Sequence, residues 1–194
     1  MFTGEIRRHS FLMRTSFIVA SLAASLMVSG PALAAHRHAQ KPDQPFLSEA
    51  ARGNMLEVEL GRLADSHAEQ TSVKDFGRRM VDDHTKIEGD MKGLAERKGV
   101  TLPTRLTATQ KKTVDRLTKL HGSEFDRAYM SAMVEDHSKD AAKFQDEASK
   151  AADPDVKSFA SSTLATIQQH LEQAKDVQSG LSHATSGVPG TSLH

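Results

Sequence analysis

Apolar side chains recur at steps of three and four residues over most of the chain, from about residue 45 to residue 180. The clearest stripes contain Val73, Phe76, Met80, Ile87, Met91 and Leu94; Phe125, Tyr129, Met133, Phe144 and Ala148; and Val156, Phe159, Thr163, Ile167, Leu171 and Ala174. Because an α-helix turns once in 3.6 residues, this spacing directs one side of each segment toward a core. The pattern therefore predicts long amphipathic helices.

Capping residues, glycines and prolines predict where these helices begin and end. We expect long helices over residues 45–70, 72–99, 123–152 and 153–180, and a short helix between residues 107 and 121. Capping boxes at Ser72–Asp75 and Thr107–Gln110 are expected to begin the second long helix and the short helix, and Gly99 to end the second long helix. Ser123 is expected to cap the third long helix, and Asp153-Pro154 to begin the last. None of the six prolines lies inside a periodic segment.

Four helices, each roughly 40 Å long, predict an all-α four-helix bundle over residues 46–180. The second and third helices are joined by about 23 residues that include the short helix. This connection is long enough to return along the whole bundle, which is typical of the ferritin-like four-helix bundle. A simple up-down-up-down bundle, with the short helix covering one end, is the alternative.

Residues 1–35 have the features of a cleaved export signal. The basic residues Arg7, Arg8 and Arg14 come before an apolar run at residues 17–28, and Ala32-Leu33-Ala34 is a small-x-small cleavage site. An apolar run of this length is too short to span a bilayer. We expect a periplasmic protein, with outer-membrane association as a further hypothesis and a buried N-terminal helix as the alternative.

The flanking segments add little to this organisation. The start codon is Met1 or Met13, because residues 13–34 alone form a complete signal. Residues 36–45 are a polar lead-in, and residues 181–194 are small and polar, as in a disordered tail.

Charge and cysteine content exclude several classes of function. Residues 1–35 hold three of the 25 basic and one of the 25 acidic residues, which leaves 22 basic and 24 acidic residues, a net charge of −2. This balance gives no reason to expect nucleic acid or an anionic membrane as partner. The chain has no cysteine, so it has no disulfide and no thiolate metal site. No later segment is apolar enough to cross a membrane. A partner protein in the cell envelope and a homo-oligomer are both compatible with the sequence.

Four polar residues lie on the inward stripes, each within about one turn of the midpoint of its helix. They are Glu57, His84, His137 and His170. Midpoints share one level of a bundle, so these side chains are expected to converge. Three imidazoles and a carboxylate are suitable ligands for one transition-metal ion, with iron, zinc, copper and manganese as candidates. The alternative is a buried hydrogen-bond network without metal.

The two nearly identical segments MVDDHTK (residues 80–86) and MVEDHSK (residues 133–139) add further candidates. Asp83 and Asp136 precede His84 and His137 and are able to orient a histidine ligand. Glu88 is one turn beyond His84. Met80 and Met133 are interpreted first as core residues; the alternative is that their thioethers join the histidines, a combination that suits copper.

Four segments carry a resemblance to a known family: FLSEAARGNMLEVELGRLA, VKDFGRRMVDDHTKIEGDMKGLAERKGVTLP, FDRAYMSAMVEDH and FASSTLATIQQHLEQA. The chain resembles, over residues 46–175, a bacterial family of exported domains of unknown function that have a ferritin-like fold and are often labelled outer-membrane proteins. The resemblance implies that Asp126 and Tyr129 occupy motif positions together with Glu57 and the three histidines.

The sequence departs from di-iron ferritins in one respect. Those proteins carry Glu-x-x-His on two helices. The residues three positions before the three histidines are Val81, Val134 and Ile167. The bridging carboxylates of a di-iron centre are therefore missing.

Three functions follow from these observations. The first is a metal-binding bundle with a buffering or envelope stress-protection role, which is not an enzyme. The second is a structural or interaction module of the cell envelope. The third is an iron- or manganese-dependent oxidoreductase, which needs further carboxylate ligands such as Glu88.

Overall fold

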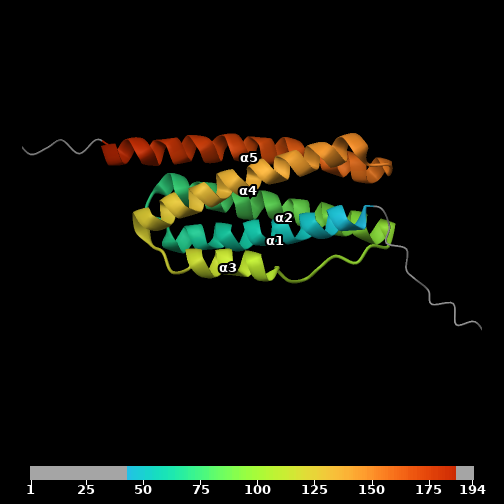
Figure 1. Cartoon of the computed structure of the whole chain (residues 1–194), viewed down its shortest axis with the longest axis horizontal. Helices are drawn as coiled ribbons and strands as arrows, with labels where there is room; N and C mark the ends of the chain where they lie inside the picture. Colours follow the sequence, from blue (N-terminus) through green and yellow to red (C-terminus); the bar gives the residue numbers. More distant parts are fainter. Residues whose placement is uncertain (1–42, 187–194) are drawn as a thin grey trace, which may run out of the picture. The chain divides into compact units, whose positions relative to one another are not determined.

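The computed structural model describes residues 43–186, which form five α-helices and contain no strand (Figure 1). The helices are α1 (Gln44–His67), α2 (Thr71–Lys98), α3 (Ala108–Leu117), α4 (Gly122–Lys150) and α5 (Pro154–Ser186). The prediction of an all-helical chain with four long helices and one short helix is confirmed. The expected export signal, the lead-in up to residue 42 and the tail from residue 187 lie outside the described residues. No described helix is long and apolar enough to cross a membrane.

Several predicted helix ends are confirmed. Gly99 ends α2 with φ of 58°, in the left-handed region that favours glycine. Thr107 and Gln110 form both hydrogen bonds of a capping box at the start of α3. The Asp153 carboxylate accepts from the backbone N–H of Asp155 and Val156, so it caps α5.

Other predicted ends are wrong. Neither Ser72 nor Ser123 is a cap: α2 follows Gln70, and α4 starts at Gly122, whose φ of 59° makes the turn. Helix α1 ends at His67 rather than residue 70, and α5 continues past Gly180 to Ser186. Residues 181–186 therefore belong to a helix and not to the tail.

A contact with another helix explains the wrong ends near residue 70. The Asp126 carboxylate on α4 accepts hydrogen bonds from the backbone N–H of Glu69 (3.1 Å) and Gln70 (2.9 Å). These bonds satisfy two donors of the α1–α2 turn. Local capping signals do not show such a partner, because it lies 56 to 57 residues away in sequence.

The four long helices pack as two hairpins, α1 with α2 and α4 with α5. The hairpins meet through α1 against α4 and α2 against α5, and α3 packs on α1 and α4. Asp126, near the start of α4, contacts the α1–α2 turn, whereas Lys98, at the end of α2, pairs with Asp153 at the start of α5 (2.7 Å). Helices α2 and α4 therefore run in the same direction, and residues 99–121 return along the bundle (Figure 1).

Helices α1 and α2 approach each other closely at a pair of glycines. A Cβ atom on Gly61 would lie 2.7 Å from the carbonyl oxygen of Gly77, and one on Gly77 would lie 2.5 Å from the Cβ of Ala64. Neither contact is sterically allowed. The α1–α2 hairpin therefore requires glycine at both positions.

The core consists of two apolar clusters. Cluster one contains the buried residues Leu47, Ala51, Ile87, Met91, Leu94, Ala95, Val100, Phe144, Val156, Phe159, Ala160, Leu164 and Ile167. Cluster two contains Leu56, Leu60, Ala64, Ala68, Val73, Phe76, Met80, Leu117, Phe125, Tyr129, Met130, Met133 and Ala174. Near the boundary between the two clusters each long helix carries buried polar residues, namely Asn54, Glu57, His84, His137 and His170. We call these five residues the polar layer.

Candidate metal centre

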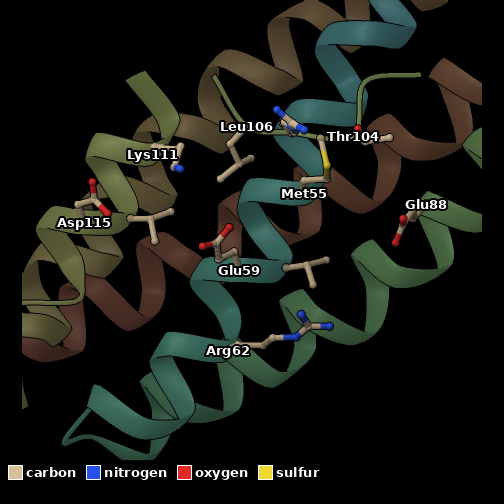
Figure 2. A pocket seen from close by; sticks show the side chains of 11 residues that line it. Met55, Glu59, Arg62, Glu88, Thr104, Leu106, Lys111 and Asp115 are labelled. Atoms are coloured by element: carbon tan, nitrogen blue, oxygen red, sulfur yellow. The ribbon is translucent and has the colours of Figure 1, made fainter. Parts of the chain in front are cut away.

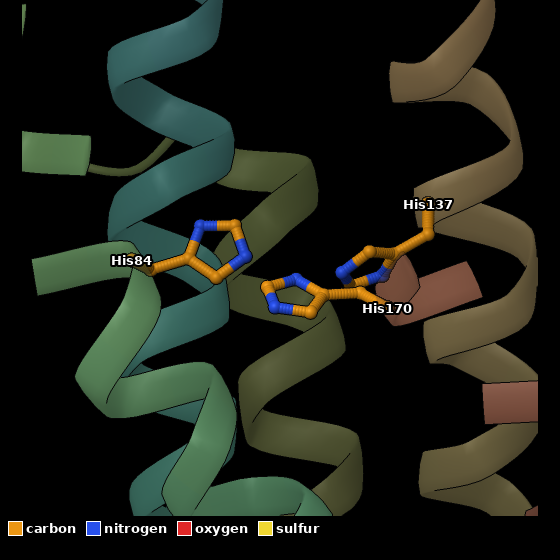
Figure 3. A group of neighbouring side chains, drawn as sticks. All are labelled: His84, His137 and His170. Atoms are coloured by element: carbon orange, nitrogen blue, oxygen red, sulfur yellow. The ribbon is translucent and has the colours of Figure 1, made fainter. Parts of the chain in front are cut away.

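Three histidines from three helices meet in the polar layer. His84 is on α2, His137 on α4 and His170 on α5, and all three are buried, with 5%, 2% and 0% exposure. One nitrogen of each ring lies within 4.8 Å of the corresponding nitrogens of the other two. Figure 3 shows the three rings side by side between the helices. The three histidines therefore lie at one level of the bundle, as their positions near the helix midpoints predicted.

Each imidazole has one nitrogen in a hydrogen bond. His84 Nδ1 bonds to Asn54 Oδ1 (3.0 Å), His137 Nδ1 to the carbonyl oxygen of Met133 (2.9 Å) and His170 Nε2 to Asp83 Oδ2 (3.0 Å). All three partner atoms are acceptors, so each of these nitrogens donates a proton. The tautomer of each neutral ring is thereby defined.

The other nitrogen of each ring has no hydrogen-bond partner. These atoms are His84 Nε2, His137 Nε2 and His170 Nδ1. In the tautomers just defined, each carries a lone pair. A buried lone pair without a partner is unfavourable by about 1–3 kcal/mol, and a metal ion satisfies three of them at once.

The histidines are held in the neutral form that a metal requires. Burial, together with the nearby His137 and His170, lowers the pKa of His84 to about 3, and burial together with His170 lowers that of His137 to about 4. Burial also lowers the pKa of His170, although Asp83 opposes this shift. At neutral pH the site therefore presents three uncharged imidazoles.

Two residues orient these histidines. Asp83 is partly buried, which opposes ionisation, but hydrogen bonds from His170, Arg79 and Lys86 lower its pKa, so it is a carboxylate. Asn54 orients His84 and was not singled out from the sequence. Its position three residues before Glu57, on the same side of α1, is the signal that sequence reasoning missed.

Glu57 lies beside the histidines but outside the group of three. It is 1% exposed, and neither carboxylate oxygen has a hydrogen-bond partner. Its Oε1 lies 3.9 Å from His137 Nδ1, the nitrogen that donates to Met133. Burial, with contributions from Asp136 and Asp140, raises the pKa of Glu57 well above its ordinary value. The carboxyl group is therefore poised to bind either a proton or a cation.

The remaining candidate residues have other surroundings. Asp126 holds the α1–α2 turn, away from the histidines. Tyr129 is fully buried in cluster two, and its hydroxyl has no partner. The side chains of Met80 and Met133 belong to the same cluster, so both are core residues. Met133 contributes only its backbone carbonyl to the site.

Glu88 is directed away from the histidines. It pairs with Lys92 (2.6 Å) and lines a surface groove of about 710 Å³ between α1, α2 and the α3 region. Figure 2 shows side chains of both charges along this groove, including Glu59, Arg62 and Lys111. None of the three histidines lines it. The histidine site is therefore separate from this groove.

The arrangement can hold one metal ion in a nitrogen-rich site. Metal–nitrogen bonds of about 2.0–2.1 Å place the nitrogens of a tetrahedral ion roughly 3.4 Å apart. One nitrogen of each ring now lies within 4.8 Å of the others, so the three rings would have to move closer together to reach this geometry. Imidazole ligands suit zinc, copper and iron.

Comparison with known proteins places the chain in a family. Residues 28–177 match the family described as Domain of unknown function (DUF4142). The chain belongs to this family. The match agrees with the expected family of unknown function. No curated protein matches the chain.

A solved structure shares the fold. It is the crystal structure of a DUF305 fragment from Deinococcus radiodurans, with a TM-score of 0.64 and 14% sequence identity. The alignment covers 72% of this chain and 97% of the fragment. At this level of identity the similarity concerns the arrangement of the helices.

Proposed function

We propose that this DUF4142 protein binds one transition-metal ion through His84 Nε2, His137 Nε2 and His170 Nδ1. One observation carries the proposal: three buried neutral imidazoles, with one nitrogen of each within 4.8 Å of the others, each use one nitrogen in a hydrogen bond and leave the other without a partner. Hydrogen bonds to the second nitrogen of a metal-bound histidine are the rule in metal sites. Glu57 or a small molecule completes the coordination.

The proposed biological role is metal buffering or protection of the cell envelope against stress. A periplasmic location follows from the export signal predicted in residues 1–35, and outer-membrane association is a further proposal. The direction of α2 and α4 and the long connection between them support a ferritin-like topology. The missing Glu-x-x-His pairs argue against di-iron chemistry and favour binding over turnover.

A structural module without metal is the second candidate. It is favoured by the hydrogen bonds that His84, His137 and His170 already form with protein groups. The oxidoreductase candidate is less favoured, because Glu88, the carboxylate it needs, pairs with Lys92 at a surface groove.

Metal analysis of protein purified without an affinity tag tests the proposal. We expect close to one bound ion per chain after incubation with Zn²⁺ or Co²⁺ and buffer exchange, and none in a variant with His84, His137 and His170 all changed to Ala. The matched control changes His67 and His121 to Ala, a stacked pair of rings 4.2 Å apart outside the polar layer.

Stability separates the two candidates. A ligand at 100 times its Kd raises the free energy of unfolding by about 2.7 kcal/mol. We expect this increase in the wild type and in the control but not in the triple variant. Unfolding that is indifferent to metal and to chelator, together with equal metal contents, would establish the structural module instead.

A further inference from the structure

The contact between α1 and α4 carries one buried and two partly exposed acidic groups that the three-histidine site does not use. Glu57 on α1 has two carboxylate oxygens without a partner. On α4, Asp136 and Asp140 are one turn apart and both act on the charge of Glu57. Gly53 makes room for one of them, because a Cβ at this position would lie 3.3 Å from Asp140 Oδ2. We call this region, defined by Glu57, Asp136 and Asp140, the acidic seam.

The acidic seam runs from solvent to the histidines. Asp140 is 22% exposed at its side chain, lies 3.8 Å from the Lys143 ammonium and lines, together with Lys143, a surface hollow between α1 and α4. Asp136 lines a second hollow, between α1, α3 and α4. Glu57 is 1% exposed, and its Oε1 lies 3.9 Å from the ring of His137. Carboxyl groups therefore occur at two partly exposed positions and at one buried position next to the site.

The contact between α2 and α5, on the other side of the histidines, is bridged by a positively charged side chain, Arg79. Arg79 on α2 donates hydrogen bonds to Gln173 (2.7 Å) and Gln169 (3.2 Å) on α5 and to Asp83 (3.3 Å). These bonds tie the two helices together in front of His170, which is bonded to the same Asp83. A guanidinium at this point repels an approaching metal ion.

We propose that a divalent cation reaches the three-histidine site through the acidic seam, with Asp140 or Asp136 binding it first and Glu57 passing it to the histidines. This inference rests on the proposed metal-binding function and adds the route to it. A hydrated cation must exchange its water molecules for protein ligands before it enters a buried site. Carboxylates are suitable intermediate ligands, since they attract the ion and release it to imidazole, which first-row metals such as zinc and copper prefer.

Rapid-mixing kinetics with Co²⁺ as the probe tests the route. The variants are Asp136→Asn and Asp140→Asn, which remove one ionisable carboxyl group each and keep the side-chain shape. The matched control is Glu135→Gln, next to Asp136 on α4, whose carboxylate is exposed and pairs with Lys139. We expect the association rate to fall about tenfold in each variant, the size of an electrostatic steering effect, and to stay unchanged in the control.

Dissociation distinguishes a route from simple attraction. A cation that enters through the seam also leaves through it, so release to a chelator should slow by a similar factor and leave the Kd within about threefold. Association rates equal to that of Glu135→Gln would overturn the route and leave the metal site intact. An unchanged release rate with a weakened Kd would also overturn the route. Faster association in Arg79→Gln would overturn it too, because the ion would then enter between α2 and α5. Failure of the wild type to bind Co²⁺ would remove both the site and the route.

Discussion

The two apolar clusters and the polar layer between them are both buried, but they differ in how many of their buried atoms lack a hydrogen-bond partner. Within clusters one and two, apolar side chains need only close packing. The polar layer contains six of the seven buried side-chain atoms that lack a hydrogen-bond partner within the described residues; the seventh is the hydroxyl of Tyr129. Such atoms are rare in native proteins and mark a missing partner. We therefore expect changes in the clusters to act mainly on stability, and changes in the layer to act mainly on the proposed metal binding.

The layer also lies where the two hairpins meet. Each long helix contributes to it: Asn54 and Glu57 from α1, His84 from α2, His137 from α4 and His170 from α5. A metal ion bound as proposed by His84 and His170 would link one hairpin to the other. Metal binding is therefore expected to strengthen the contact between the hairpins more than the packing inside them.

The largest effect is expected from a change inside a cluster. Leu94→Ala removes a side chain that is 1% exposed in cluster one, and should lower the free energy of unfolding by about 2–5 kcal/mol. Metal affinity should stay within about twofold, because Leu94 does not contact the histidines. Urea denaturation and metal titration measure the two quantities. Leu102→Ala, at a partly buried position on the same cluster, should cost about 1 kcal/mol; equal losses in both variants would contradict this expectation.

A change beside the polar layer should weaken metal affinity strongly and lower the free energy of unfolding less than Leu94→Ala does. Asp83→Ala removes the acceptor of His170 Nε2 and should weaken metal affinity 10- to 100-fold, as is usual for partners of metal-bound histidines. Stability without metal should fall by about 1–3 kcal/mol, because the buried N–H of His170 loses its acceptor. Asp82→Ala, at an exposed neighbouring position, is the control. An affinity loss shared by both variants would show that general charge, rather than orientation of His170, is responsible.

A further effect concerns pH in the absence of metal. The pKa of His84 is about 3 in the folded protein and about 6.5 when unfolded, so the unfolded chain binds more protons between these values. The free energy of unfolding should fall as the pH drops below 6.5, by up to about 1.4 kcal/mol per unit from this residue. Glu57 acts in the other direction, because its raised pKa lets the folded state take up a proton first.

The variant His84→Gln isolates the histidine contribution. It removes one titrating group, so its stability between pH 6.5 and pH 4 should depend less on pH than that of the wild type. Denaturation in chelator at several pH values provides the comparison. Parallel curves for the two proteins would indicate that His84 titrates normally and that the layer is open to water.

The sequence by itself determined the helices and the level of the site. Steps of three and four residues predicted four long helices, because burying one side of a helix requires that period. Gly99, Thr107 and Asp153 set helix ends through bonds within a few residues. The midpoints of the helices then placed His84, His137 and His170 at one level, where the structure brings their rings together.

The tertiary structure alone decided which atoms are left for a ligand. Asn54 and Asp83 select the free nitrogen of His84 and of His170, and Asn54 comes from a different helix than the histidine it contacts. Asp126 ends α1 through a bond across 57 residues. Arg79 closes one contact between the hairpins, whereas Asp136, Asp140 and Glu57 make the other acidic. Helical period specifies which side of a helix is buried, but hydrogen bonds between helices depend on directions and distances that exist only once the helices have packed.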